Sequence, residues 1–417
     1  MTSDLSSRCV ILGAGHAAAP CALALRKEGW SGPITMVGEE PGPPYHRPPL
    51  SKAYVKGEVT RESLLIRPAS VYEQNGIHLA LGVRAEEIDR AWQQVRLSDG
   101  TILPYDRLIL ATGSLNRRPP IAGLERPGVF FLRTAADADA LREAAGPAAR
   151  VVLVGGGYIG LELAASFRGR GLSVTLLEKG PRILSRVTSP EISAFFQAVH
   201  QEEGVAIHTG VTVVEIQGSA PALRVVTRAG DIHEADLVIV GTGAMPNTAL
   251  AAAAGLAVEH GIVVDEQNRT SDPCIQAIGD CAQQFHPLYD RALQLASVQN
   301  ATDQAKTAAA ALTGKPIPAR PLPWFWSDQY NIKLQIAGLS SGYTALVLRG
   351  TADHRRSFSA WYFRGPRLLA VDAVNDPAAY VTGRQLIERQ VLLDPAAVAD
   401  PARDLKSLPP HRPGVSP

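Results

Sequence analysis

Two stretches of the chain share one pattern of hydrophobic and polar positions. Residues 8–26 and residues 150–168 each begin with an apolar, β-branched run, pass through a glycine cluster and continue in a helical pattern. Each stretch is followed by a second apolar run that closes on a carboxylate, in ITMVGEE and in VTLLEKG. This order is typical of a strand–helix–strand unit. Its repetition at the scale of a domain predicts two nucleotide-binding domains.

Further elements are predicted around these two units. Short apolar or alternating runs indicate strands at residues 94–97, 101–103, 105–113, 235–243, 332–338, 344–350, 358–365 and 367–374. Helical patterns lie at residues 250–254, 297–312 and 377–390. An Asp-Gly turn joins the first two of these strands into a hairpin. The proline-rich residues 314–323 are typical of a linker, so a separate α+β domain is expected to follow.

The first glycine cluster, GAGHAA, directly follows the strand residues 10–12. Gly13 permits a tight turn, and Gly15 lets a pyrophosphate approach the free N–H groups of the helix. Glu39 ends the next strand, where a carboxylate can accept hydrogen bonds from ribose hydroxyls. Pro20 lies early enough in the helix to be tolerated, with a kink. The candidate residues of this dinucleotide site are Gly13, Gly15, His16, Ala17, Ala18 and Glu39.

The second cluster, GGGYIG, follows the apolar run VVLV. Glu178 ends the following strand, where its carboxylate would accept from a free ribose hydroxyl pair and repel a 2′-phosphate. We therefore expect NAD rather than NADP. Arg182 and Arg186 lie nearby, and we interpret them as solvated residues at a helix entry. The candidate residues of this site are Gly155, Gly157, Tyr158, Ile159, Gly160 and Glu178.

Two fingerprints require two dinucleotides. Two NAD molecules would leave the electrons without an acceptor, whereas one FAD and one NAD(H) supply a hydride acceptor and a hydride donor.

Composition narrows the possible partners. The 417 residues carry 41 Lys and Arg against 40 Asp and Glu, a net charge of +1, which excludes a globally basic nucleic-acid binder. The mean hydropathy is +0.01, and the first apolar run is broken by glycine, histidine and proline, so neither a membrane span nor an export signal is expected. The four cysteines form no CxxC pair. We therefore expect a cytoplasmic protein without a disulfide framework, a zinc module or a dithiol redox centre.

Several longer strings resemble one family. The order GAGHAA, ATG, GGGYIGLE, GTGAMPN and AIGDCA is similar to that of flavoprotein reductases with two dinucleotide domains. The strings PPYHRPPLSKAY, TSDPCIQAIGDCA, SVQNATDQA and PWFWSDQY resemble one branch in particular. That branch contains the FAD-dependent NADH:ferredoxin reductases that serve bacterial haem-thiolate monooxygenases and aromatic-ring dioxygenases. The similarity runs from about residue 8 to about residue 400.

The resemblance implies an α/β fold of the glutathione reductase-like kind. Its two Rossmann-like dinucleotide-binding domains would be followed by a C-terminal α+β domain. The expected division is residues 1–113 and 241–320 for the FAD-binding domain, 114–240 for the NAD-binding domain and 321–417 for the C-terminal domain. We expect a monomer or a weak dimer.

The resemblance also assigns residues to the flavin. Asp280 would bind the ribityl chain, although it is also a candidate helix N-cap. Lys52 would lie near the N5 edge and pair with Glu162, where a cation stabilises reduced, anionic flavin. Trp326 would lie beside the isoalloxazine ring. The remaining residues implied for FAD are Arg47, Ala111, Thr112, Gly113, Ser297 and Val298, and Gly243 is implied for NAD. The residues implied for the chemistry itself are Lys52, Glu162 and Trp326.

The electrons need an exit, because the chain lacks the cysteine pair of disulfide reductases and the loop cysteine of peroxidase-type NADH oxidases. The family's acceptor is a 2Fe–2S ferredoxin, and Lys306 is implied as a residue that contacts it. The expected destination is a haem-thiolate monooxygenase, with an aromatic-ring dioxygenase as the alternative. Direct reduction of oxygen or a quinone and an NADH-sensing role, as in apoptosis-related flavoproteins, stay open as rivals.

Overall fold

The chain divides into two compact units in the computed structural model, which describes residues 4–147, 149–351 and 356–408. The first unit comprises Met1–Arg47, Thr60–Leu115 and Ala244–Arg320. The second unit comprises Pro48–Val59, Asn116–Gly243 and Pro321–Pro417. Residues 409–417 of the expected C-terminal domain lie outside the described residues. The expected division into FAD-binding, NAD-binding and C-terminal domains stays a prediction.

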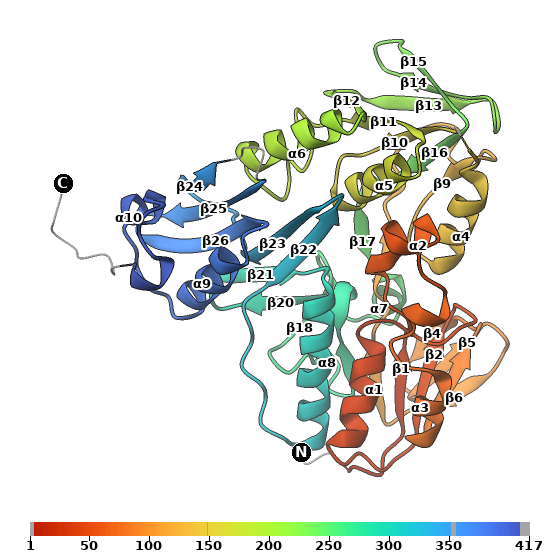
Figure 1. The fold of residues 1–417 in the computed structure, drawn as a ribbon. Coiled ribbons are helices and arrows are strands. Elements are labelled where there is room, and N and C mark those ends of the chain that lie inside the picture. Colours follow the sequence, from red (N-terminus) through yellow and green to blue (C-terminus); the bar gives the residue numbers. More distant parts are fainter. Residues whose placement is uncertain (1–3, 148, 352–355, 409–417) are drawn as a thin grey trace. The chain divides into compact units, whose positions relative to one another are not determined.

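The first unit is built on a five-stranded parallel sheet in the order β19-β7-β1-β2-β3. Its strands are β1 (Cys9–Leu12), β2 (Ile34–Gly38), β3 (Ile77–Leu81), β7 (Arg107–Leu110) and β19 (Ile275–Ala277). Helix α1 (Ala18–Lys27) follows β1, and α8 (Val298–Thr313) lies alongside it (Figure 1). Strands β1, β2 and β7 are almost wholly buried on both faces, which explains why these segments are largely apolar runs rather than alternating ones.

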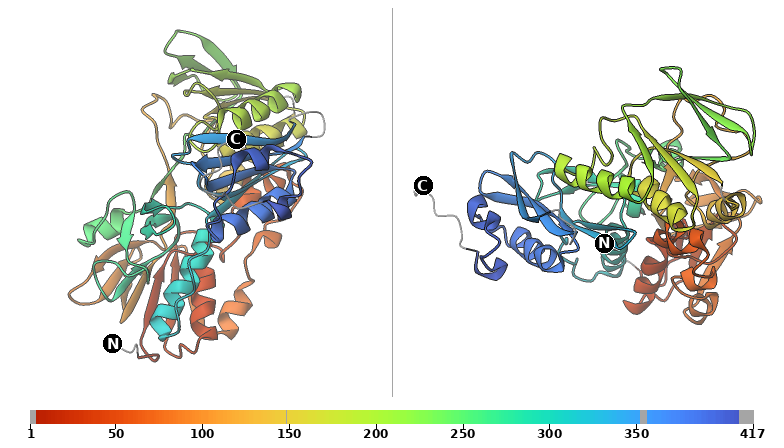
Figure 2. Two further views of the ribbon diagram at one scale, coloured as in Figure 1. Left: turned by 90° about the vertical axis from the view of Figure 1, so that its left-hand side faces the viewer. Right: turned by 45° about the horizontal axis from the view of Figure 1, so that its top comes forward.

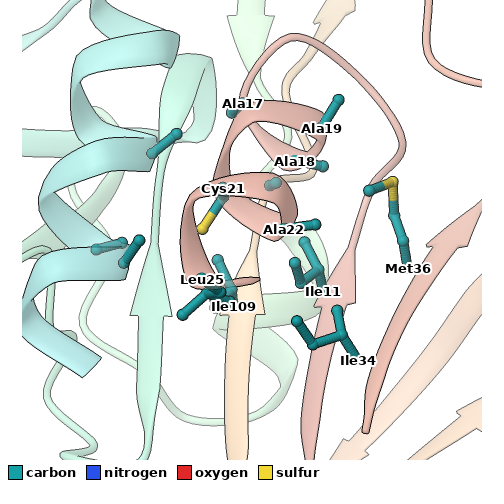
Figure 3. Packing of buried hydrophobic residues seen from close by; sticks show 14 of the residues in the cluster. Ile11, Ala17, Ala18, Ala19, Cys21, Ala22, Leu25, Ile34, Met36 and Ile109 are labelled. Atoms are coloured by element: carbon teal, nitrogen blue, oxygen red, sulfur yellow. The ribbon is translucent and has the colours of Figure 1, made fainter. Parts of the chain in front are cut away.

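One hydrophobic cluster of the first unit forms where α1 meets the sheet. Figure 3 shows Ala22 of the helix beside Ile11 of the sheet, and Ala18, Cys21 and Leu25 belong to the same buried cluster. The alanines of α8 complete this cluster. Small side chains on both helices permit their close approach, so the alanine-rich sequence is a packing requirement. Pro20 occupies the third position of α1, where its missing N–H has no partner to lose within the helix.

Smaller elements complete the first unit. They are η2 (Glu62–Leu64), α3 (Ala69–Gln74), β4 (Ala85–Asp89), β5 (Gln94–Leu97), β6 (Ile102–Pro104), β8 (Ser114–Asn116), β17 (Ala244–Pro246), α7 (Ala249–Ala253), β18 (Ile262–Val264), η3 (Gly279–Cys281), β20 (Ala282–His286) and β21 (Arg291–Gln294). Strands β4, β5 and β6 form an antiparallel sheet, and the expected hairpin about the Asp-Gly turn is its β5–β6 half.

The second unit repeats the design with a sheet in the order β12-β11-β10-β16-β9, parallel throughout. The strands are β9 (Val129–Phe130), β10 (Arg150–Val154), β11 (Ser173–Glu178), β12 (Ala206–Thr209) and β16 (Leu237–Val240). Helix α5 (Tyr158–Gly169) connects β10 to β11 in the way that α1 connects β1 to β2. The remaining elements of this part are η1 (Pro48–Ser51), α2 (Ala53–Lys56), α4 (Ala135–Ala144), α6 (Pro190–Glu202), β13 (Val213–Gln217), β14 (Leu223–Thr227) and β15 (Ile232–Ala235).

The C-terminal residues form an antiparallel sheet in the order β22-β23-β26-β25-β24. Its strands are β22 (Trp324–Gln329), β23 (Ile332–Gly338), β24 (Ala345–Thr351), β25 (Ser357–Arg364) and β26 (Arg367–Val374). Helix α9 (Pro377–Glu388) packs on this sheet, which is blue in Figure 2, and α10 (Pro395–Ala399) and η4 (Leu405–Ser407) follow. The α+β character expected for this region is therefore confirmed, and β22 is a strand that the sequence patterns did not single out.

Candidate functional site

The first glycine cluster forms a turn that tolerates no side chain at its first position. A Cβ on Gly13, which has a φ of +117°, would lie 2.1 Å from the Ala111 carbonyl oxygen. The turn is therefore packed directly on the Ala111–Gly113 segment. A Cβ on Gly15 would meet no atom within 4 Å. The space beside Gly15 lies at the start of α1, where free backbone N–H groups attract a pyrophosphate, so this unit fits a dinucleotide.

Two carboxylates follow β2, and their surroundings separate them. The Glu39 side chain is 72% exposed and pairs with Arg84 at 3.6 Å, which leaves it accessible to ribose hydroxyls. Glu40 accepts from Arg47 at 2.6 Å and from the Tyr45 hydroxyl at 2.6 Å. The guanidinium of Arg47 also lies over the Tyr45 ring. Arg47, expected at the flavin, is thus held in place by the chain itself, and its flavin contact stays a prediction.

The other residues expected for FAD gather around the ends of the same sheet. Ser297 caps α8 by accepting from the Asn300 N–H at 3.1 Å, and Val298 is the first residue of that helix. Thr112 donates its hydroxyl to the Asn247 carbonyl at 2.7 Å. His16 lies 3.2 Å from His46 between ring nitrogens. Ala17 and Ala18 are buried beneath the turn.

Asp280 lies inside the short turn η3 and accepts from the Ser114 hydroxyl at 2.9 Å. The residue at the N-cap position of η3 is Ile278, and the element that follows is strand β20. The alternative interpretation of Asp280 as the N-cap of a following helix is therefore wrong. The ribityl-binding role stays a prediction.

The second glycine cluster repeats the construction of the first. A Cβ on Gly155 would lie 2.4 Å from the Gly241 carbonyl oxygen, and one on Gly160 would lie 2.3 Å from that of Gly155. A Cβ on Gly157, the N-cap residue of α5, would meet nothing within 4 Å. The same open position at a helix N-terminus therefore fits a second pyrophosphate. Gly243 lies on the neighbouring turn with a φ of +105° and open space around it.

Glu178 is held by backbone amides. Its Oε2 accepts from the Gly156 N–H and its Oε1 from the Gly180 N–H, each at 2.6 Å. Each carboxylate oxygen keeps a second acceptor position. The carboxylate is consequently fixed in direction while still able to bind ribose hydroxyls.

Arg182 has a structural role that the sequence pattern did not indicate. Its guanidinium is half-buried and donates to the carbonyls of Ser185, Thr188 and Ser189 and to the Ser193 hydroxyl. The interpretation of Arg182 as a solvated residue is therefore wrong, because the carbonyls of the loop before α6 need a donor. Arg186 is exposed, as expected.

Lys52 and Glu162 form the expected ion pair. Lys52 Nζ lies 2.7 Å from Glu162 Oε2, with the Glu162 side chain 5% exposed and the Lys52 side chain 20% exposed. Ser51 donates to the same oxygen at 2.5 Å, and Ser327 donates to Oε1 at 2.7 Å. Glu162 lies on α5, two residues beyond the last glycine of the second cluster, so the pair belongs to the unit that contains this cluster.

Aromatic side chains of β22 lie close to the start of α5. The rings of Tyr158 and Phe325 are 4.9 Å apart, and Trp326 contacts Trp324 at 5.4 Å between ring centroids. Ile159 is 49% exposed and presents an apolar side chain beside the glycine turn. The flavin contact expected of Trp326 and the NAD contacts expected of Tyr158 and Ile159 stay predictions.

Lys306 lies on the exposed side of α8. Its side chain is 58% exposed, and its nearest acid is Asp303 at 3.9 Å. An ammonium with such a long ion pair remains available to a partner. The expected contact with a ferredoxin stays a prediction.

All four cysteines are free. Burial raises the pKa of the Cys9 thiol to about 12, and it raises the pKa of Cys21 and Cys281 as well. A buried thiol is a poor nucleophile, so these side chains serve packing, as the sequence indicated for Cys281. Within the described ranges there is no group of three or more metal-ligating side chains, and no helix is both long and apolar enough to cross a membrane.

Residues that the sequence did not single out complete the surroundings of Glu162. They are Ser51, His200, Ser327 and Gln329. One signal for two of them exists in PWFWSDQ, where serine and glutamine alternate with Asp328 along a strand. Two polar residues on one face are expected to be satisfied internally when that face is buried.

Two parallel sheets, each with a glycine turn open to a pyrophosphate, define a protein with two dinucleotide-binding folds. A family model described as pyridine nucleotide-disulphide oxidoreductase matches residues 7–305. A second, described as reductase C-terminal, matches residues 324–409. The chain belongs to the pyridine nucleotide-disulphide oxidoreductase family, whose cofactors are FAD and NAD(H).

The curated relatives match nearly their whole length. Rhodocoxin reductase of Rhodococcus erythropolis is 46% identical over 95% of this chain and 93% of its own. Putidaredoxin reductase of Pseudomonas putida is 44% identical over 96% of both. Among solved structures, the covalent putidaredoxin reductase–putidaredoxin complex matches with a TM-score of 0.93 and 43% identity, over 96% of this chain and 97% of that one. A ferredoxin reductase for the CYP199A2 system from Rhodopseudomonas palustris matches with a TM-score of 0.92 and 41% identity, over 96% and 98%.

Proposed function

We propose that the protein is an FAD-dependent NADH:ferredoxin reductase that passes electrons from NADH to a 2Fe–2S ferredoxin. The observation that carries this proposal is the match to the reductase of the putidaredoxin complex over 96% of the chain, including the C-terminal domain. The free and mostly buried cysteines support it, because a thiol relay of the disulfide-reductase kind would need an accessible pair.

The residues divide the work as follows. The backbone at Gly15 with the Asp280 carboxylate would hold FAD, and the backbone at Gly157 with the Glu178 carboxylate would hold NADH. Bound FAD would supply the ability to accept a hydride and to release its two electrons singly. No general base is needed, so the protein contributes orientation and electrostatics.

Lys52 and Glu162 form the charged pair of this site. A cation placed where a hydride arrives stabilises the negative charge that it brings, and that effect is strongest where water is excluded. The buried Glu162 carboxylate keeps the Lys52 ammonium in one place at 2.7 Å. We propose Lys52, Glu162 and Trp326 as the residues nearest the hydride transfer.

The ferredoxin would serve a haem-thiolate monooxygenase. The relatives that reduce rhodocoxin and putidaredoxin, at 46% and 44% identity, support this choice. An aromatic-ring dioxygenase is the second candidate, because the reductase of an anthranilate 1,2-dioxygenase system from Burkholderia cepacia is 40% identical. A cytoplasmic location agrees with four cysteines that are all free thiols.

The test is anaerobic and aerobic turnover of the purified yellow protein with NADH and a panel of 2Fe–2S ferredoxins. We expect rapid NADH oxidation that depends on an added ferredoxin. Equal rates with and without ferredoxin in air would identify an oxidase instead. Slow turnover together with NADH-linked dimerisation would identify an NADH-sensing flavoprotein.

A further inference from the structure

A line of polar side chains crosses the apolar interior of the second unit and ends on Glu162. Its members are Ser327 and Gln329 of β22, His200 of α6 and Tyr330 of the turn that follows β22. Ser327, Gln329 and His200 are each at most 1% exposed. Polar groups in such a position destabilise a fold unless each is hydrogen-bonded, so the arrangement of their partners carries information.

The links of this line are continuous. Ser327 Oγ lies 2.7 Å from Glu162 Oε1, and Gln329 Nε2 lies 3.1 Å from Ser327 Oγ. Gln329 Oε1 lies 2.8 Å from His200 Nε2. His200 Nδ1 lies 3.1 Å from the Tyr330 hydroxyl. Four hydrogen bonds therefore join a half-buried tyrosine to the carboxylate that holds Lys52.

The direction of every bond follows from the carboxylate at the end. Glu162 can only accept, so Ser327 donates its hydroxyl proton and in turn accepts from the Gln329 amide N–H. Gln329 then presents its oxygen to His200, which must donate from Nε2. This leaves Nδ1 of His200 to accept from the Tyr330 hydroxyl. All four donors point toward Glu162, and aligned hydrogen bonds of this kind strengthen one another.

The state of His200 agrees with this direction. Burial lowers the pKa of His200 to about 4, so its ring is neutral at ordinary pH and carries one N–H. This N–H must be on Nε2, because Nε2 faces the Gln329 oxygen, which can only accept. Tyr330, which supplies the donor furthest from Glu162, opens the two-residue hairpin turn between β22 and β23, and this turn accounts for its φ of +55°.

Gln329 also limits what the line of polar side chains can do. A hydroxyl or an imidazole can pass a proton from one side to the other, but a primary amide donates from nitrogen and accepts at oxygen. A proton therefore does not travel along this line. The line of polar side chains can orient and polarise Glu162, but it cannot conduct protons to the surface.

We propose that Ser327 and His200 are positioning residues of the hydride-transfer site, which act through Glu162 to fix the direction of the Lys52 ammonium. The inference rests on the proposed function, in which Lys52 stabilises the charge brought by the hydride. Ser51 and Lys52 donate to one oxygen of Glu162, and Ser327, the last member of the line of polar side chains, donates to the other. With both oxygens held, the carboxylate cannot rotate away from Lys52.

The first test needs no turnover. Nitrogen-15 NMR of the histidine-labelled, FAD-loaded protein reports which ring nitrogen of His200 carries the proton, and the signal is assigned by its loss in His200→Phe. We expect the Nε2–H tautomer, with no titration between about pH 5.5 and pH 8. An Nδ1–H tautomer would overturn the proposal, because the hydrogen bonds of His200 would then run in the opposite direction.

The second test is stopped-flow reduction of the bound flavin by NADH. We expect Ser327→Ala to slow this step about 10-fold, since a hydrogen bond to a charged group is lost. Ser327→Thr keeps the hydroxyl and should stay within about 2-fold of wild type. The dissociation constant for NADH should not change in either variant.

Ser359→Ala is the matched control. Ser359 is a fully buried serine of the same sheet. Its hydroxyl donates to Asp376 and accepts from Trp361, and neither residue belongs to the line of polar side chains. Equal rates for Ser327→Ala and Ser359→Ala would overturn the proposal. Should Ser327→Ala fail to fold, His200→Phe breaks the line of hydrogen bonds at His200. A rate of flavin reduction equal to wild type would then count against the proposal.

A third measurement separates this inference from a general loss of stability. In Glu162→Gln the carboxylate is gone, so adding Ser327→Ala should slow the reaction little further. Additive slowing would mean that Ser327 does not act through Glu162. If the wild-type protein did not oxidise NADH at all, the proposed function would fail, while the tautomer of His200 would still test the chain.

Discussion

At the scale of single residues, the glycines of each fingerprint divide into two kinds. Gly13 and Gly155 are closed in by carbonyl oxygens of the chain at 2.1 and 2.4 Å, whereas Gly15 and Gly157 face open space. The first kind is required by the fold. We expect the second kind to be required by the ligand, because a side chain there would occupy the place expected for the pyrophosphate.

We therefore expect Gly15→Val and Gly13→Val to differ. Gly15→Val should fold with near-native circular dichroism but retain little FAD, whereas Gly13→Val should not accumulate as folded protein. The ratio of flavin absorbance to protein, measured after gel filtration, checks this. Full FAD retention by Gly15→Val would contradict the assignment of the first unit to FAD.

Glu178 provides the prediction for cofactor choice. Wild type should prefer NADH strongly over NADPH, and Glu178→Ala should narrow the preference by lowering kcat/KM for NADH about 10-fold or more, as expected for lost hydrogen bonds to a charged group. Steady-state kinetics with both cofactors measures it. Glu178→Gln keeps an acceptor oxygen for only one of the two amides, of Gly156 or Gly180, and turns an N–H toward the other, so it reports how far the loop depends on both hydrogen bonds. Equal use of both cofactors by wild type would show that the interpretation of Glu178 is wrong.

At the scale of elements, the loop before α6 is fastened to the C-terminal sheet by a buried carboxylate. Asp372 of β26 accepts from Thr188 and from Tyr362 of β25, each at 2.5 Å. The Tyr362 hydroxyl also accepts from the Ser189 N–H at 3.2 Å. Because Arg182 binds the carbonyls of the same loop, the segment after Glu178 has its position set from two sides.

Asp372 makes a pH-dependent contribution whose sign can be derived. Burial raises its pKa from 3.8 to about 6, so between these values the folded protein holds a proton that the unfolded chain has lost. The contribution of Asp372 to the free energy of unfolding is therefore full below about pH 4 and is lost as the pH rises through 6. Asp372→Asn removes this dependence. The free energy of unfolding of the variant, relative to wild type, should increase by about 2–3 kcal/mol between pH 4 and pH 6.5.

Urea unfolding followed by circular dichroism at half-unit pH steps measures this difference. Taking the variant relative to wild type cancels the opposite contribution of His200, whose lowered pKa makes its stabilisation fall as the pH drops from about 6.5 toward 4. Parallel stability curves for the two proteins would show that Asp372 does not titrate in this window.

At the scale of the whole molecule, a net charge of +1 leaves no global attraction for a partner. A transient complex with an acidic ferredoxin must rely on local basic residues and should weaken with salt. Lys306 is well suited, because its side chain is 58% exposed and lies 3.9 Å from its nearest acid.

We expect Lys306→Glu to slow electron transfer to ferredoxin severalfold at low salt and to leave NADH reduction of the bound flavin unchanged. Stopped-flow traces of the two half-reactions separate these effects, and the difference between variant and wild type should shrink as salt is raised. Ferredoxin reduction as fast as wild type at low salt would remove Lys306 from the docking surface.

Much of the fold follows from local sequence. Each glycine turn, its strand, its helix and the acidic residue after the next strand lie within about 30 residues, and backbone geometry fixes their relation. The strands β23, β24, β25 and β26 and the helices α8 and α9 also carry their own periodicity. The Lys52–Glu162 pair has no such local signal, because its two residues lie on separate segments. It was expected only from the family resemblance.

The sequence by itself determined the two glycine turns at helix N-termini that fit a pyrophosphate, because glycine conformations and helix N-termini are local properties. The tertiary structure alone decided what surrounds Glu162. Ser327 reaches it across 165 positions of the chain, and His200 joins Gln329 across 129. It also decided that Arg182 holds a loop instead of facing solvent, and that Asp280 lies within a turn and caps no helix. A buried polar group takes the partner that the packing of distant elements brings to it, and hydrophobic periodicity does not encode that choice.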